Sequence, residues 1–233
     1  MNNEFFKFPS TPHLVALDGT EVRDDKVLSE AERKEFLQHQ VVVEEKVDGA
    51  NLGISFDSEG AIYLQNRGSI LKLPGAGQWK NLEQWIDLKT DEIFEVITDR
   101  FILFGEWCYA KHSVYYNQLP DWFLGFDLYD KKNSKFLSTN LRDKAFGKMG
   151  ISKIPLIETG YFTLSKLAQL LTQSRLSDQP AEGLYLRVER DDWLSQRAKL
   201  VRPSFIQSVE QHWSRSSITP NQLDLNVWEE PSD

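Results

Sequence analysis

A lysine between two apolar runs is the first residue of the chain whose type and position suggest covalent chemistry. Lys46 ends a strand-like run and precedes an Asp-Gly pair, in the segment Val41-Val42-Val43-Glu44-Glu45-Lys46-Val47-Asp48-Gly49-Ala50-Asn51. A lysine amine has a reference pKa of about 10.4, so a nucleophilic lysine must be partly desolvated or lie beside other cations. The alternative is a hairpin, because Asp-Gly between two strands is a common turn that Lys46 would merely flank.

Two glutamates stand in positions that favour a chemical role. Glu106 interrupts the apolar run 101–107, where a charge is costly without a partner. Glu182 precedes Gly183, which lets another backbone approach closely, although for an isolated Glu182 a solvated loop residue after Pro180 would be the favoured interpretation. Carboxylates and cations together are what phosphoryl transfer requires, to hold Mg²⁺ and to bind phosphate.

The order of five segments resembles the motifs of the covalent nucleotidyltransferases, the family of ATP-dependent RNA and DNA ligases and mRNA capping enzymes. The segments are Lys46-Val47-Asp48-Gly49, Phe104-Gly105-Glu106-Trp107, Phe123-Leu124-Gly125-Phe126-Asp127-Leu128-Tyr129-Asp130, Glu182-Gly183-Leu184-Tyr185-Leu186-Arg187 and Arg197-Ala198-Lys199-Leu200-Val201-Arg202. The resemblance covers residues 41–202. The stretch from Glu106 to Asp130, with Tyr109-Ala110-Lys111-His112-Ser113, is most similar to RNA ligases.

The resemblance implies a reaction. Lys46 would attack the α-phosphate of ATP to form lysyl-AMP, and the AMP would then pass to a 5′-phosphate end that a 3′-hydroxyl attacks. Glu182 would hold Mg²⁺ or Mn²⁺. Glu106 would accept from a ribose hydroxyl, and Lys199 would bind phosphate.

The resemblance implies further nucleotide contacts, each with a structural alternative. Arg67 would touch ribose or the strand end, or be a surface residue beside a turn, and Phe126 would stack on adenine or pack in the core. Asn51 and Glu45 match positions that RNA ligases use in the active site, whereas turn formation alone would select Asp48.

The last motif departs from the family pattern at one place. Where the family has two lysines two residues apart, this chain has Arg197 and Lys199. Arginine keeps the charge but does not replace lysine where close approach matters. Arg202 is either a compensating cation or an exposed residue at a strand end.

The elements that must position these residues indicate an α+β fold, with antiparallel sheets and flanking helices around a nucleotide cleft. Short apolar runs predict strands over residues 41–45, 51–56, 61–66, 101–107, 122–129, 181–189 and 197–202. Helical spacing predicts helices over residues 29–37, 78–100, 139–149, 163–175 and 203–213. We expect one domain over residues 1–233, with residues 203–233 forming a C-terminal helix and tail.

Composition narrows the function classes. A net charge of −8 argues against a protein that coats nucleic acid, so any basic surface must be local. Cys108 is expected to be buried, the four histidines have no metal-site spacing, and no P-loop motif occurs. No long apolar run suggests a signal peptide or a membrane span, so a cytoplasmic protein is expected. A monomer is a separate expectation.

The residues after Lys199 are too few for an OB barrel, which favours a minimal RNA ligase. Its partners would be RNA ends or a nicked duplex, and an end-processing enzyme. The alternatives are a DNA-nick ligase or guanylyltransferase of the same fold, or a non-catalytic module that binds RNA ends or nucleotides.

Overall fold

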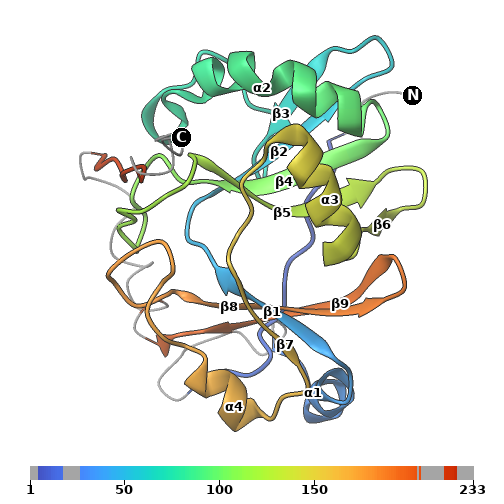
Figure 1. Ribbon diagram of the computed structural model, residues 1–233, viewed down its shortest axis with the longest axis vertical. Helices are drawn as coiled ribbons and strands as arrows, with labels where there is room; N and C mark the ends of the chain where they lie inside the picture. The colour runs from blue at the N-terminus through green and yellow to red at the C-terminus, as the bar shows by residue number, and fades with distance from the viewer. Residues whose placement is uncertain (1–4, 18–26, 204, 206–217, 225–233) are drawn as a thin grey trace, which may run out of the picture.

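The strands of the chain form two antiparallel sheets that face each other (Figure 1). The computed structural model describes residues 5–17, 27–203, 205 and 218–224. Within these residues, one sheet has four strands in the order β7-β1-β8-β9 and the other has five in the order β3-β2-β4-β5-β6. All strand pairs are antiparallel, which confirms the predicted α+β class.

The elements have the following bounds. The strands are β1 (Val41–Lys46), β2 (Ala50–Phe56), β3 (Ile62–Gln65), β4 (Phe101–Trp107), β5 (Phe123–Asp130), β6 (Lys135–Phe136), β7 (Leu156–Gly160), β8 (Gly183–Arg190) and β9 (Trp193–Val201). The helices are α1 (Glu30–Leu37), the 3₁₀ turn η2 (Gly77–Trp79), α2 (Leu82–Ile97), α3 (Thr139–Met149) and α4 (Leu164–Gln169). Ser29 caps α1 through a capping box with Glu32, as the sequence predicts for this helix start.

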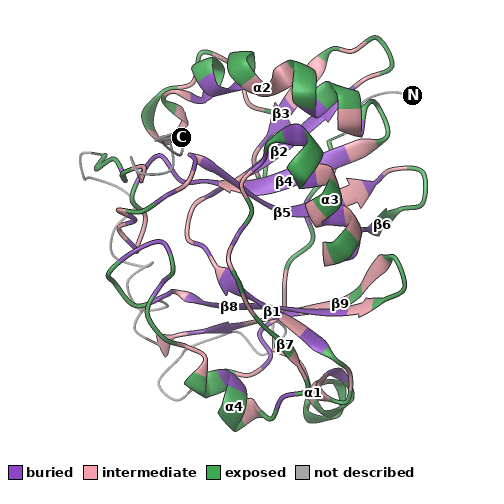
Figure 2. Cartoon of the chain, in the orientation of Figure 1, coloured by how far each residue is buried: buried purple, intermediate pink, exposed green. Residues whose placement is uncertain are grey.

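Helices cover the outer face of each sheet, and apolar side chains pack between each sheet and its helices. Helices α2 and α3 pack on the five-stranded sheet, where Trp85 and Ile93 meet Leu52 and Ile54 of β2. Helices α1 and α4 lie against the four-stranded sheet, and Figure 2 shows the buried residues concentrated on the strands of both sheets. The fold is therefore layered as helices, sheet, sheet and helices.

The N-terminal segment links the two sheets. The Phe8 ring packs edge-on against Phe104, Phe126 and Phe136 of the five-stranded sheet, with centroids 5.0, 5.3 and 5.5 Å away. Further along, Leu14 N donates to Lys199 O on β9 at 2.8 Å. Residues 5–17 thus help to hold β9, and Lys199 with it, in register with the opposite sheet.

The predicted helix over residues 163–175 is wrong beyond Gln169. Glu45 accepts hydrogen bonds from Ser174 Oγ and Arg175 N, and Arg202 donates to the carbonyls of Leu171 and Thr172. Because these tertiary partners satisfy the backbone and side-chain groups after α4, the chain leaves the helix there. Helical spacing in the sequence contains no information about such distant partners.

Other differences are smaller. Strand β9 begins at Trp193, four residues before the predicted strand, and the short strands β6 and β7 were not predicted. The predicted C-terminal helix over residues 203–213 lies mostly outside the described residues, and the single-domain assignment stays a prediction. No OB barrel occurs in the described part of the chain. None of the described helices is long and apolar enough to cross a membrane.

Candidate active site

Lys46 lies at the point where the chain crosses from one sheet to the other. Strand β1 belongs to the four-stranded sheet and β2 to the five-stranded sheet, so residues 47–49 join two sheets and do not close a hairpin. The hairpin alternative is therefore wrong. A Cβ atom on Gly49 would lie 3.0 Å from both Glu106 Cβ and Trp107 O, which explains why glycine suits the crossing.

Strand pairing brings Glu182 to Lys46. Lys46 is the Cα partner of Gly183 at the end of β1, and the preceding Glu182 accepts a hydrogen bond from Lys46 Nζ through Oε2 at 2.7 Å. A Cβ on Gly183 would lie 2.4 Å from Leu200 O, so the close approach of β8 and β9 requires glycine here. The predicted catalytic and metal-site residues are thus in direct contact.

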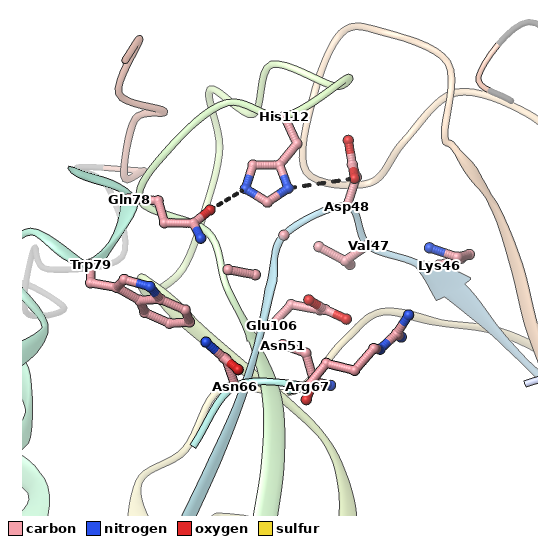
Figure 3. Close-up of a pocket in the computed structure, with 12 residues that line it drawn as sticks. Lys46, Val47, Asp48, Asn51, Asn66, Arg67, Gln78, Trp79, Glu106 and His112 are labelled. Atoms are coloured by element: carbon pink, nitrogen blue, oxygen red, sulfur yellow. Dashed lines mark hydrogen bonds and ion pairs between the residues drawn. The ribbon is translucent and has the colours of Figure 1, made fainter. Parts of the chain in front are cut away.

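Strand pairing also places Asn51 beside Glu106, its Cα partner on β4. Both side chains line a pocket of about 390 Å³ together with Lys46 (Figure 3). Asn51 Nδ2, Asn51 Oδ1 and Glu106 Oε2 are buried without a hydrogen-bond partner. Buried polar atoms in native proteins are nearly always hydrogen-bonded, so these atoms mark a place where a polar ligand would bind.

Burial and neighbouring charges shift the ionisation of this site. Burial raises the pKa of Glu106 to about 8, against the opposing effect of the positive charges of Lys46 and Arg67. Burial lowers the pKa of Lys46, but the carboxylates of Glu182, Asp48 and Glu106 outweigh it and leave a net rise. Without a bound ligand, Lys46 is therefore an ammonium ion held by carboxylates, rather than a free amine beside cations.

Two predicted cations lie within electrostatic range of these carboxylates. Arg67 follows β3, lines the pocket and lowers the pKa of Glu106 through its charge. Lys199 on β9 is the Cα partner of Tyr185, and its charge lowers the pKa of Glu182 against the larger effect of burial. Lys46, Glu106, Glu182, Arg67 and Lys199 therefore form one electrostatic site drawn from both sheets.

Two more predicted residues, Glu45 and Phe126, are not among those that line the pocket. Glu45 is buried and holds the loop after α4 through Ser174 and Arg175, and burial raises its pKa. Phe126 packs against Phe8 and Tyr185. Of the two roles considered for Phe126, stacking on adenine or packing in the core, the observed contacts are those of core packing.

Arg197 and Arg202 are both held by protein groups. Arg197 forms an ion pair with Asp127 at 3.1 Å and stacks over the rings of Phe8 and Phe136. Arg202 donates to three backbone carbonyls, those of Ala181, Leu171 and Thr172. Neither proposed role of Arg202, a compensating cation or an exposed strand end, describes these contacts.

The pocket contains four residues that sequence reasoning did not assign to it: Asn66, Gln78, Trp79 and His112. Gln78 Oε1 lies 3.0 Å from His112 Nε2, and His112 Nδ1 lies 3.9 Å from Asp48 Oδ1 (Figure 3). Burial lowers the pKa of His112. The only sequence signal for any of them was the resemblance of residues 109–113 to RNA ligases.

Asp48 holds part of the pocket lining in place through hydrogen bonds. It accepts hydrogen bonds from Ser113 N at 2.6 Å and Val114 N at 3.1 Å, and its own N–H donates to Tyr116 Oη at 2.8 Å. These bonds fix the loop that carries His112. Cys108 lies behind the same loop, fully buried, as the sequence predicted, and burial raises its pKa well above the ordinary value.

The site offers carboxylate ligands for a divalent metal, but the described residues do not supply a complete coordination shell. No group of three or more His, Cys, Asp or Glu side chains suited to a metal occurs among the described residues. Mg²⁺ commonly binds one or two carboxylates and completes its shell with substrate phosphates and water. The carboxylate of Glu182, which contacts Lys46, and the unpartnered Oε2 of Glu106 fit that mode of binding.

Two facing antiparallel sheets with a lysine pocket where they meet define a nucleotidyltransferase-like fold. The family model described as RNA ligase matches residues 39–201, well over half of the chain. The chain therefore belongs to the RNA ligase family. No curated protein sequence matches the chain.

Among the solved structures that match this fold are chains of Naegleria gruberi RNA ligase. One lysine-to-alanine mutant, solved with ATP and Mn, matches with a TM-score of 0.60 and 14% identity over 75% of this chain and 53% of that chain. A lysine-to-methionine mutant with AMP and Mn gives 0.59 and 15% over the same shares. At this identity the likeness shows the fold alone, and the present chain spans about half the length of these relatives.

Proposed function

We propose that this chain is an ATP-dependent RNA ligase that joins 5′-phosphate and 3′-hydroxyl ends through lysyl-AMP on Lys46. One observation carries the proposal: the amine of Lys46 lies against Glu182, in a pocket where polar atoms of Asn51 and Glu106 are buried without partners. Membership of the RNA ligase family supports it, as do the structures of Naegleria gruberi RNA ligase with ATP or AMP and Mn.

In the first step, Lys46 Nζ forms a bond to the α-phosphorus of ATP while the bond from that phosphorus to the bridging oxygen breaks and pyrophosphate leaves. The ammonium must first lose a proton, which the carboxylates around it oppose. A positive charge bound beside Glu182 would offset those carboxylates and lower the pKa of Lys46. This explains why a catalytic lysine can be surrounded by acids in the ligand-free protein.

Glu182 would bind Mg²⁺ or Mn²⁺ through its carboxylate. When bound, such an ion offsets phosphate charge and polarises the phosphate oxygens. Lys199 lies on the neighbouring strand, close enough to influence Glu182, and would hold phosphate without occupying the metal position. Glu106, Asn51 and Arg67 would bind the ribose and the strand end, because their side chains line the pocket.

Three residues predicted to touch the nucleotide are proposed to act by positioning. Glu45 fixes the loop after α4 beneath the end of β1, Phe126 packs between the sheets, and Arg197 ties β9 to Asp127 of β5. Glu45 and Arg197 hold the strands that carry Lys46 and Lys199, and Phe126 packs on Tyr185 of β8, the strand between them. Cytoplasmic location, a monomeric state and an end-processing partner stay predictions.

The test is covalent labelling. Purified protein is incubated with Mg²⁺ and either α-labelled ATP or α-labelled GTP, then separated on a denaturing gel. We expect a labelled band with ATP alone, followed by transfer of the label to a 5′-phosphorylated RNA nick in preference to a DNA nick. A band with GTP would indicate capping chemistry. Absence of label with both nucleotides, from folded protein not already adenylylated, would indicate a non-catalytic module.

A further inference from the structure

The pocket around Lys46 has a second wall whose chemistry differs from the charged one. Lys46, Asn51, Arg67 and Glu106 supply charge and polar atoms, whereas Trp79, with Gln78 and Asn66, supplies an aromatic ring and amides. In Figure 3, Trp79 and Lys46 stand on opposite sides of the pocket. An aromatic face beside amide groups is suited to a nucleobase, through stacking and hydrogen bonds to its edge.

This second wall is fixed by bonds to the protein core. Gln78 O accepts from Nε1 of the fully buried Trp107 at 2.8 Å, and the Gln78 side chain is held by His112 at 3.0 Å. Trp79 packs partly against the core under α2 and is partly exposed. A ring held in this way loses little conformational freedom on binding.

The turn that carries Arg67 is fixed as well. Asn66 Oδ1 accepts hydrogen bonds from Gly68 N and Ser69 N, each at 2.8 Å, and from Ser69 Oγ at 3.2 Å. These bonds occupy the oxygen of Asn66. The loop therefore presents Arg67 at the rim of the pocket in a defined backbone conformation.

The segment that builds this wall is basic in an acidic protein. Residues 61–82 contain Arg67, Lys72 and Lys80 but no Asp or Glu, in a chain with 35 acidic residues and a net charge of −8. All three cations are exposed. Exposed cations interleaved with an aromatic ring are typical of surfaces that bind a nucleic-acid strand.

We infer that residues 66–80 are the docking rim for the RNA end to be joined, with Trp79 stacking on its terminal base and Arg67, Lys72 and Lys80 contacting its phosphates. The inference rests on the proposed function and names the surface that selects its substrate. The three cations along residues 66–80 favour an RNA strand as the ligand of this rim over the adenine base of free ATP. A strand has phosphates along its length for these cations to contact, whereas the phosphates of ATP would lie at Lys46.

The first test measures RNA binding without ATP. Fluorescence anisotropy of a labelled nicked RNA duplex gives the affinity of wild type, Trp79→Ala, Trp79→Phe and Tyr161→Ala. Stacking predicts that Trp79→Ala weakens binding about tenfold and that Trp79→Phe retains most of it. Tyr161 is also exposed but lies outside the pocket, so its variant should bind like wild type and serves as the control.

A second measurement separates RNA from ATP. For Trp79→Ala, we expect KM for a pre-adenylylated RNA strand to rise about tenfold, while KM for ATP in lysyl-AMP formation changes less than about twofold. Normal RNA affinity with a raised KM for ATP would place the adenine of ATP on Trp79 and overturn the inference. RNA binding is measured without ATP, so this result does not depend on lysyl-AMP formation. Failure of the wild-type protein to form lysyl-AMP would refute the proposed function without changing the binding result.

Salt dependence tests the cations of the rim. The double variant Lys72→Gln with Lys80→Gln should reduce the slope of log affinity against log salt by about one to two, since each phosphate contact contributes about 0.7 to 0.9. Lys132→Gln, an exposed lysine in the β5–β6 turn, is the matched control. An unchanged slope in the double variant would overturn the phosphate contacts.

Discussion

Two clusters of charged side chains occupy the molecule, and they differ in how completely their polar atoms are paired. The first, here called the paired cluster, comprises Glu44, Asp127, Arg142, Arg187 and Arg197. Arg142 donates to both oxygens of Glu44, and Asp127 accepts from Arg187 at 2.5 Å and Arg197 at 3.1 Å. The second is the Lys46 pocket, where Asn51 and Glu106 have buried atoms without partners.

The difference shows what distinguishes a structural ionic network from a binding site. Both clusters contain buried charges, and both contain residues from the predicted motifs. Only the pocket retains hydrogen-bonding capacity that the protein itself does not use. On this basis, the paired cluster fastens β1 and β8 of one sheet to β5 and α3 of the opposite layer, and the pocket is left for ligand.

The largest effect is expected in the paired cluster. Arg142→Ala would leave the buried carboxylate of Glu44 without its cation, so the free energy of unfolding should fall by about 3 to 5 kcal/mol. Urea denaturation measures it. Replacing both partners, as Arg142→Met with Glu44→Leu, should recover much of the loss. Equal stability of wild type and Arg142→Ala would show that the cluster does not fasten the layers.

Beside Lys46, Glu182→Ala should slow lysyl-AMP formation about 100-fold, equivalent to about 2.7 kcal/mol, because it removes the proposed metal ligand. Additional Mg²⁺ should restore the rate only in part. The rate is measured by single-turnover labelling, with Glu158→Ala on the exposed edge of β7 as the control. A wild-type rate in Glu182→Ala would rule out the metal role.

Asn51→Ala should separate activity from stability. Its amide has no protein partner, so the free energy of unfolding should change by less than about 0.5 kcal/mol. Joining of a nicked RNA should fall about tenfold, because the amide is available to the ligand. Asn117 lies outside the pocket, its Oδ1 is also buried without a partner, and its Nδ2 donates to Asp178, so Asn117→Ala serves as a control that should join RNA like wild type. A large loss of stability in Asn51→Ala with normal joining would reverse the assignment.

Glu106→Gln tests the raised pKa of about 8. Because the folded pKa lies above the unfolded one, the folded protein binds the extra proton, and this contribution to stability is lost as pH rises from about 4.5 to 8. Glutamine has no proton to lose over this pH range. The variant should therefore gain stability over wild type by more than about 1 kcal/mol between pH 5 and pH 8. An equal difference in the free energy of unfolding between Glu106→Gln and wild type at pH 5 and at pH 8 would contradict the raised pKa of Glu106.

The positions in the fold of those candidate residues that depend on local order could be predicted from the sequence. Lys46 at a strand end, Glu106 on an apolar strand and Glu182 before glycine stand where the motifs placed them, because each depends on neighbours a few residues away. The α+β class followed from the same apolar runs. Lys46 and Glu182, separated by 136 positions in the chain, meet through the pairing of β1 with β8.

What could not be predicted depends on partners distant in the chain. Arg197 has the type and position of a phosphate ligand, yet Asp127, 70 positions away, pairs with it. Gln78 and Trp79 fall within the helix predicted over residues 78–100 but lie in the 3₁₀ turn η2, before α2 begins at Leu82. The crossing at Gly49 becomes evident only once the strands are assigned to two sheets. In each case a single sequence contains the residue but not its neighbour in space.

The most direct test of the account is to find which residue carries AMP. Protein incubated with ATP and Mn²⁺ is digested, and the modified peptide is sequenced by mass spectrometry, with Lys46→Arg and Lys199→Arg as matched variants that keep the charge. We expect AMP on Lys46 in wild type, no modification in Lys46→Arg, and modification of Lys46 at a reduced level in Lys199→Arg. AMP on another lysine, or a modified and folded Lys46→Arg protein, would contradict the assignment of Lys46 as the nucleophile.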